Sequence, residues 1–561
     1  MVVLDAQSTG ASPAHGHLLE LAWTITSAAE LAPPSCTSAS VVALPEGASI
    51  PAVIVGLTGI AAADLAGAPS DASLWQRLLA QTHVDAADDA VLPAVAHFAR
   101  FERSFLVPLH ERVAPGRPFP FELLCTKEIA RRLLPGLPRV GLRALAGYFG
   151  HDTDEPRRAG AHVAATVLVW RDLVDALAAV GVQTLAQLRA WLQQPAPRAA
   201  KRSYPMPRER RLGLPDGPGV YRMLRAGGAV LYVGKARSLR RRVNTYFQKQ
   251  QHAAGRTLEL LSQARDLEVT AVASTLEAAL LEADEIKRCD PPFNVALKAG
   301  DRAVWFACRG LSRQSPAVTR MRPIGPLGSP WAARRVVALA EGLASDDDED
   351  AVAALRRALA GWHDHHLPGP EAAALLAARD RLRERLGVRL DRRAVARAGR
   401  LAAREAAAAR TRVDDEVDPD ADGEPEPEPE FEWTPERITE HLHGHVLALA
   451  HELRRAAWLS ALSESLVEFV DHGVARVLVL ERACVVARFD ARDAPPQASP
   501  PGWRRSRRAR ARSFDLASFD RLRVLSAELR RVLDEGGEAR VVLSPTRALA
   551  GERLRRALVW G

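Results

Sequence analysis

Two tyrosines, an arginine and a glutamate within residues 219–287 are the side chains of this sequence best suited to chemistry. Tyr221 and Tyr232 lie in the short runs GVY and LYVG, and the Gly-Gly turn between the runs predicts a β-hairpin. Arg242 lies on the basic stretch that follows, where a guanidinium can bind phosphate oxygens. Glu282 lies between leucines and an isoleucine in an amphipathic stretch, where a carboxylate needs a partner or an ion.

Two helices must position these groups. The first covers 235–247 and places Ser238, Arg242 and Tyr246 four residues apart, hence on one face. The second carries Glu282 and begins at Ser274 or Thr275 as its N-cap, with Glu277 as a first-turn or capping-box acid.

The charge of the chain is concentrated around these helices. The whole sequence has a net charge of +8, and residues 201–300 hold 18 Lys or Arg against 10 Asp or Glu. A local basic excess of this kind suits a phosphate backbone, because neutralising phosphates releases condensed counterions. A merely solvated basic face is the alternative.

The segment resembles the N-terminal nuclease module of UvrC, within the GIY-YIG superfamily. The resemblance is carried by GVY and YVGKA, LRRRVNTYF, LLEADEIK and PPFNVALK, and it continues through the IGPLGSP run at 324–330. It implies hydrolysis of a DNA phosphodiester bond with one Mg²⁺ or Mn²⁺ ion. Glu282 would be the sole protein carboxylate on that ion, and Arg242 would clamp the scissile phosphate.

The same resemblance implies roles for the remaining residues of the site. Either Tyr221 or Tyr232 would take the proton from the attacking water, helped by Lys235, Arg242 or the metal, because a phenol with a pKa near 10 is a poor base. Tyr246 and Asn294 match positions that orient phosphate and metal-bound water. The motifs leave open which tyrosine is the base.

Residues 1–178 resemble a second nuclease family, the DEDDh exonucleases, to which the DNA polymerase III proofreading subunit belongs. The resemblance is carried by VVLDAQSTG, VAHFARFE, CTKEIARRLL and RRAGAHVAAT. Such enzymes hold two metal ions between four acids and use a histidine as base.

This sequence departs from the exonuclease pattern at most of its site. Asp5 keeps the first acid, Gln7 replaces the second and Glu102 takes the third. Arg157 stands where the base should be and His162 where the fourth acid should be. We therefore expect a domain without exonuclease activity that still offers a DNA-binding groove. A plain scaffold and residual activity with a displaced metal are the alternatives.

The chain is predicted to be a multidomain α/β protein, since 561 residues exceed a single core. It would combine an RNase-H-like exonuclease fold, a GIY-YIG α/β domain, a helical segment and a small C-terminal α/β domain. The expected parts are the exonuclease-like domain 1–190, a linker 191–212, the GIY-YIG domain 213–300, a UvrC-like extension with helices 301–413, an acidic disordered linker 414–432 and the C-terminal domain 433–561.

The local pattern also predicts individual elements. In the first domain we expect strands at Val2–Leu4, Leu18–Thr26, Ser40–Ala43 and Ala90–His97, and helices at Leu123–Leu134, Gly141–Tyr148 and Gly160–Ala178. In the last domain we expect helices at Ile438–Ser465 and Ser518–Leu533, strands at Ala475–Leu480, Cys484–Phe489 and Ala539–Leu543, and a terminal helix.

Weaker signals lie outside these motifs. Five scattered cysteines without a CxxC pair argue against a zinc ribbon or disulfide framework. The histidines of 363–366 and 441–451 match no known ligand spacing, and the basic tract 503–512 is either a DNA contact or a solvated loop. We also expect no membrane span, no signal peptide and a cytoplasmic location.

Three functions are compatible with these observations. The first is a metal-dependent endonuclease acting in DNA repair that makes a single incision, in the manner of the shorter UvrC-like proteins. The second is a 3′–5′ exonuclease in which the GIY-YIG module guides DNA. The third is a non-catalytic DNA-binding adaptor that recruits repair or replication proteins.

Overall fold

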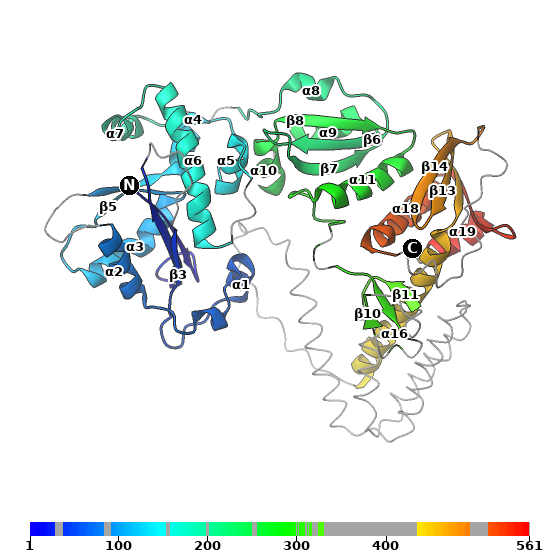
Figure 1. Cartoon of the computed structure of the whole chain (residues 1–561), viewed down its shortest axis with the longest axis horizontal. Coiled ribbons are helices and arrows are strands. Elements are labelled where there is room, and N and C mark those ends of the chain that lie inside the picture. The colour runs from blue at the N-terminus through cyan, green and yellow to red at the C-terminus, as the bar shows by residue number, and fades with distance from the viewer. Residues whose placement is uncertain are drawn as a thin grey trace. The chain divides into compact units, whose positions relative to one another are not determined.

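The computed structural model (Figure 1) describes most of the chain in two compact units. The described residues are 1–27, 37–82, 91–152, 157–197, 201–248, 255–298, 300, 302–308, 311, 314–316, 324–329, 435–493 and 514–559. One unit comprises 1–271 and 291–295, and the other comprises 272–290 and 296–561. Among the described helices, none is long and apolar enough to cross a membrane.

The first unit contains a five-stranded sheet in the order β3-β2-β1-β4-β5. Its strands are β1 Val2–Ser8, β2 Leu18–Ile25, β3 Ser38–Val41, β4 Leu92–Ala96 and β5 Phe121–Cys125. The pairs β1–β2 and β2–β3 are antiparallel, whereas β1–β4 and β4–β5 are parallel. The helices of this part are α1 Ala52–Thr58, α2 Asp71–Gln81, α3 Ala99–Val113, α4 Thr126–Leu133, α5 Leu142–Phe149, α6 Ala159–Ala179 and α7 Leu185–Gln193, with a 3₁₀ turn at Ala62–Leu65.

Alternate residues of β1 supply two separate cores. Val3 packs with residues of α4, α5 and α6, whereas Val2 and Leu4 pack with residues of α2 and α3. Because neighbouring side chains of a strand project from opposite faces, the sheet is covered on both sides. This explains why β1 is buried along its whole length, including its polar residues Asp5, Gln7 and Ser8.

The four strands predicted for this domain are present, with ends shifted by up to four residues. The helix predicted over Leu123–Leu134 is wrong at its beginning, because Phe121–Cys125 pairs with β4 and only Thr126–Leu133 is helical. That pairing is a contact between distant segments, which local periodicity does not report. The predicted linker 191–212 holds the end of α7 and a short helix, α8 Arg208–Leu212.

A second sheet in the same unit has the order β7-β6-β8. The predicted hairpin is present as β6 Gly219–Leu224 and β7 Val230–Ala236, with β8 Asp266–Ala271 antiparallel to β6 on its other side. The predicted basic helix is α9 Leu239–Gln248, and its predicted beginning at 235 is wrong, because Lys235 and Ala236 pair with β6 as the end of β7. Helix α10 Gly255–Gln263 precedes β8.

Helices α5 and α10 join the two sheets of this unit. The backbone N–H of Arg139 donates to Ser262 Oγ at 3.0 Å, and Arg143 pairs with Glu259 at 3.5 Å. Gly147 of α5 faces the Gln263 amide so closely that an added Cβ would lie 1.9 Å from it. A side chain at position 147 would therefore have to displace the Gln263 amide.

The second unit contains α11 Thr275–Cys289, which Ser274 caps as predicted, and two sheets. A three-stranded sheet comprises β9 Trp305–Ala307, β10 Gln314–Ser315 and β11 Ile324–Leu327. A five-stranded antiparallel sheet, in the order β14-β13-β12-β15-β16, comprises β12 Leu466–Asp471, β13 Val474–Glu481, β14 Cys484–Asp490, β15 Glu538–Ser544 and β16 Arg547–Ala550. Its helices are α16 Pro435–Leu462, α18 Leu516–Asp534 and α19 Gly551–Leu558.

The predicted elements of the C-terminal domain are present, but the sequence pattern missed two strands, the central strand β12 and the edge strand β16. Residues 463–465, predicted as helix, follow α16, and β12 begins at Leu466 between β13 and β15. The predicted helices of 351–410 and the acidic linker 414–432 lie outside the described residues. The overall prediction of a multidomain α/β fold is confirmed.

Candidate active site

Three tyrosines form a triangle on the hairpin and the helix that follows it. The ring centres of Tyr221 and Tyr232 lie 6.1 Å apart, and Tyr246 of α9 lies 6.2 and 6.3 Å from them. The hydroxyl oxygens of Tyr221 and Tyr246 are 2.9 Å apart, within hydrogen-bond distance. The sequence motifs anticipated these residues, and the fold brings them together.

Gly234 makes this close packing possible. A Cβ atom at this position would lie 2.4 Å from the Tyr221 hydroxyl and 2.9 Å from the Tyr232 ring. Gly234 is also the cross-strand partner of Tyr221, so the two strands place the ring directly over the glycine. A side chain here would displace a tyrosine.

Arg242 joins the aromatic cluster from α9. Its guanidinium carbon lies 5.2 Å from the ring centre of Tyr246, a cation–π distance. Desolvation lowers the pKa of Arg242, but Tyr221 and Tyr246 raise it more, so the pKa lies above its usual value. Ser238, predicted on the same face, instead bonds Asp216 and caps the helix through the N–H of Arg241.

The structure gives the two candidate bases, Tyr221 and Tyr232, different degrees of burial. Tyr221 is fully buried, and burial raises its pKa well above 10, with further increases from Tyr246 and Tyr232. Tyr232 is only half-buried. Lys235 is half-buried on the same strand, opposite Val220.

Asn294 acts on the strand that carries Tyr232. Its Oδ1 accepts from the N–H of Val233, and its Nδ2 donates to the carbonyl of Val233, both at 2.9 Å. The buried side-chain amide of Asn294 thus fixes the backbone of β7 next to Tyr232. A role in orienting metal-bound water stays a prediction.

Glu282 lies in the middle of α11 in the second unit and is half-buried. A partly exposed carboxylate is an oxygen donor of the kind that a hard divalent cation takes. Glu277, the predicted first-turn acid, accepts from Ser274 at 3.1 Å and pairs with Arg476 at 3.0 Å. It is therefore engaged in structural contacts.

The exonuclease-like residues also gather at one place in the first unit. Asp5 Oδ1 lies 3.2 Å from His162 Nδ1 of α6, and Gln7 Nε2 donates to the carbonyl of Arg157 at 2.8 Å. Glu102, in the first turn of α3, is buried. The side chain of Arg157 is exposed.

Burial strongly perturbs the two remaining acids. It raises the pKa of Glu102 to about 8, with a further contribution from the charge of Asp5, and it also raises the pKa of Asp5. One oxygen of each carboxylate is buried without a hydrogen-bond partner, as is the Gln7 amide oxygen. Uncompensated buried oxygens favour protonated acids or a bound cation.

A further carboxylate, missed from the sequence, lies beside this group. Glu20 on β2 is the cross-strand partner of Gln7, hence on the same face of the sheet. It accepts from Arg158 Nε and Nη2 at 2.9 and 2.7 Å, and from the N–H of Ala159 at 2.7 Å. Only the strand register places Glu20 beside Gln7, and only the tertiary fold brings Arg158 to Glu20, because no local motif links these positions.

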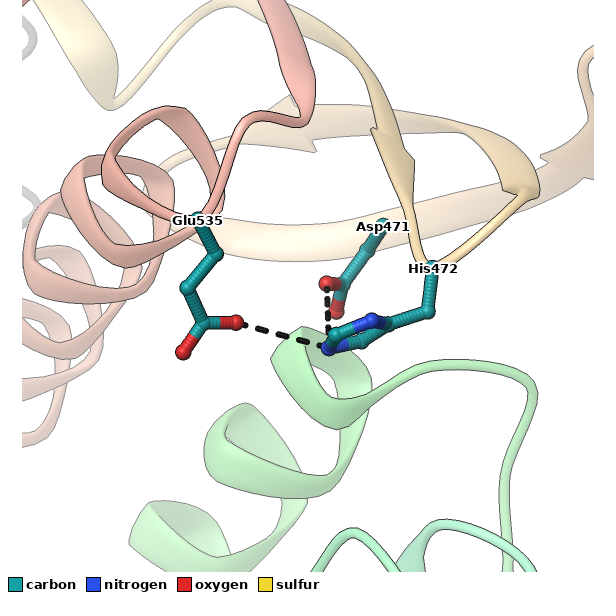
Figure 2. Close-up of side chains that lie close together, drawn as sticks. All are labelled: Asp471, His472 and Glu535. Carbon is teal, nitrogen blue, oxygen red and sulfur yellow. Dashed lines mark ion pairs between the residues drawn. The ribbon is translucent and has the colours of Figure 1, made fainter.

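A third group of titratable residues lies in the C-terminal domain (Figure 2). Among the described residues, only Asp471, His472 and Glu535 bring three such ligand atoms within 4.8 Å. Arg531 already donates to Asp471 at 2.9 Å and to Glu535 at 2.7 Å. The carboxylates are thus neutralised by a guanidinium, so we assign no metal here. The histidines of 363–366, the side chains of His441, His443 and His445 and the tract 503–512 lie outside the described residues.

Comparison with known proteins agrees with the motifs. Residues 217–295 match the family model of the UvrC-like GIY-YIG domain. Over 298 residues, the chain is 35% identical to a Mycobacterium tuberculosis protein named as a bifunctional exonuclease/endonuclease, covering 52% of this chain and 44% of that protein. Over 114 residues it is 44% identical to UvrABC system protein C of Alcanivorax borkumensis, covering 20% of this chain and 18% of that protein.

Two solved structures match shorter parts. The magnesium-bound GIY-YIG N-terminal endonuclease domain of Thermotoga maritima UvrC is 34% identical, covering 16% of this chain and 94% of that domain, with a TM-score of 0.15. Exonuclease X in complex with 5′ overhanging duplex DNA is 21% identical, covering 34% and 98%, with a TM-score of 0.24.

The chain thus resembles proteins that combine an exonuclease-like part with a UvrC-like GIY-YIG domain. These matches support a phosphodiester hydrolase. The matched segments span less than half the length of both curated relatives.

Proposed function

We propose that this protein is a metal-dependent DNA endonuclease of the UvrC-like GIY-YIG type that acts in DNA repair in the cytoplasm. The observation that carries the proposal is the cluster of Tyr221, Tyr232 and Tyr246 with Arg242 beside it, inside the segment 217–295 that matches the domain model.

Each residue of the cluster has its own role in this proposal. Arg242 binds the scissile phosphate with its planar, permanently charged group. Tyr232 takes the proton of the attacking water, because Tyr221 is buried and hydrogen-bonded, and its raised pKa leaves less of it as the phenolate that could accept a proton. Tyr221 and Tyr246 hold the ring of Tyr232 in place.

Glu282 is the residue that would hold a Mg²⁺ or Mn²⁺ ion, which when bound polarises a phosphate oxygen and supplies ordered water. The domain of the Thermotoga maritima protein, which binds magnesium, supports this choice of ion. The proposal needs a single carboxylate ligand, and Glu282 offers one on a rigid helix.

The N-terminal domain is proposed to bind DNA without cutting it. Its altered acids support this, and so does a pocket of about 710 Å³ along α3 and α4. The pocket is lined by Arg100, Arg103, Lys127, Arg131 and Phe98, and Lys127 Nζ lies 4.3 Å from the centre of the Phe98 ring. Cations with an exposed aromatic ring suit single-stranded nucleic acid.

Cleavage assays with nicked, damaged and 3′-labelled duplexes in Mg²⁺ test the proposal. We expect internal cuts that disappear in Glu282→Gln and Arg242→Ala and persist in Asp5→Ala. Stepwise 3′ shortening that is lost in Asp5→Ala would instead establish the exonuclease function, which the name of the Mycobacterium tuberculosis relative favours. Salt-sensitive binding with no cleavage of any substrate would establish the adaptor function.

A further inference from the structure

The C-terminal domain holds helix α11 along the side opposite Glu282. Leu276 and Leu280 of α11 belong to the same buried core as Leu459 of α16 and Phe519 of α18. An α-helix completes a turn in 3.6 residues, so Glu282, two positions after Leu280, projects from the other side of the helix.

Ion pairs reinforce this packing along the same side of α11. Positions 277, 280, 284 and 287 follow one another at three- and four-residue steps, so they share a face. The three charged residues of this face pair with residues of β13 and α18 in the C-terminal domain. Glu277 pairs with Arg476 at 3.0 Å, Asp284 with Arg521 at 2.8 Å and Lys287 with Asp520 at 2.6 Å.

Asp520 is the most buried carboxylate of these pairs, with 2% of its side chain exposed. It accepts from Lys287 and, through its other oxygen, from Arg302, each at 2.6 Å. Neutralising it would leave two cations beside a buried amide, which is costly. The neighbouring Arg521 also donates to the carbonyl of Ala483 at 3.0 Å and so connects α11 with the turn between β13 and β14.

We propose that the C-terminal domain is a positioning element for the metal ligand Glu282, acting on α11 through Asp520 and Arg521. The proposal rests on the function proposed above for Glu282. Restrained at positions 277, 284 and 287, the helix cannot rotate or slide without breaking ion pairs, so the carboxylate on its other side keeps one orientation. A ligand held in this way loses less freedom when it binds a cation.

The test compares two buried carboxylates in the full-length protein. Asp520→Asn removes the charge that holds α11, whereas Asp471→Asn removes an equally buried charge, 4% exposed, whose partner Arg531 lies in the same domain. The measurements are hydrogen exchange of the amides of 275–289 and Mn²⁺ affinity by electron paramagnetic resonance. We expect Asp520→Asn to speed the exchange and to weaken Mn²⁺ binding, each about tenfold, and the control to change neither.

Equal effects of the two variants on exchange and on Mn²⁺ affinity would overturn the proposal. Should Asp520→Asn fail to fold, Arg521→Gln removes the pair with Asp284 and must act in the same direction. Glu282→Gln separates the two proposals. If it binds Mn²⁺ like the unmodified protein, the proposed role of Glu282 fails, and exchange in α11 still reports whether Asp520 restrains the helix.

Discussion

The hydroxyl oxygen of Tyr221 lies 2.9 Å from that of Tyr246, and this contact joins the buried face of the hairpin to the first helix after it. The contact gives the two tyrosines of the hairpin different environments. Tyr221 is fully buried and hydrogen-bonded to Tyr246. Tyr232 is half-buried and packs against the rings of Tyr221 and Tyr246.

The first prediction concerns these two tyrosines. Tyr232→Phe should lower the single-turnover cleavage rate about 100-fold or more, because it removes the proton acceptor. Tyr221→Phe should lower it only about tenfold, since it removes one hydrogen bond that orients Tyr246. A larger loss in Tyr221→Phe than in Tyr232→Phe would reverse our assignment.

The second prediction concerns Gly234. Gly234→Ala places a methyl group against the Tyr221 hydroxyl and the Tyr232 ring, so the tyrosines must separate. We expect a loss of about 1–3 kcal/mol in the free energy of unfolding and of most cleavage activity. Gly228→Ala is the matched control for activity, because nothing lies within 4 Å of its added Cβ, although its positive φ makes it strained. Equal cleavage by the two variants would contradict the steric argument.

The third prediction concerns the pH dependence of stability at Glu102. In the folded protein the pKa of its carboxyl is raised to about 8, mainly by burial, whereas in the unfolded chain it ionises near 4.5. Its contribution to stability is therefore full below pH 4.5, declines as the pH rises and is lost above about 8. The variant Glu102→Gln has no ionisable carboxyl at this position, so its stability lacks this decline with rising pH.

Urea unfolding at several pH values measures the effect. Glu102→Gln should match the unmodified protein at pH 5 and exceed it by about 4 kcal/mol at pH 9. Added Mg²⁺ should not change this difference if no ion binds between Asp5 and Glu102. A Mg²⁺-dependent stabilisation that vanishes in Glu102→Gln would show that the N-terminal site still takes metal.

The fourth prediction concerns the ion pair between Arg158 and Glu20. Arg158→Ala leaves the buried Glu20 carboxylate with only the N–H of Ala159, and it should cost roughly 2–3 kcal/mol. The double variant with Glu20→Gln should recover much of this loss, because the unpaired charge is gone. Additive losses in a double-mutant cycle would mean that the two side chains do not interact.

The sequence by itself determined the local elements of the site. The hairpin of β6 and β7, helix α9 and the Ser274 cap of α11 follow from turn glycines, helical spacing and a capping residue. These features depend on residues a few positions apart, so their signals are contained in short stretches. The motifs also predict Tyr221, Tyr232 and Tyr246 as residues of one site.

The tertiary structure decided what depends on distant partners. It buried Tyr221 more deeply than Tyr232, set Glu20 beside Gln7 through strand register and paired Asp520 with Lys287 across 233 positions of the chain. It also turned Phe121–Cys125 and Leu466–Asp471 into strands, because each pairs with segments remote in sequence. Burial and charge pairing arise only when such segments meet, so patterns within short stretches of sequence cannot predict them.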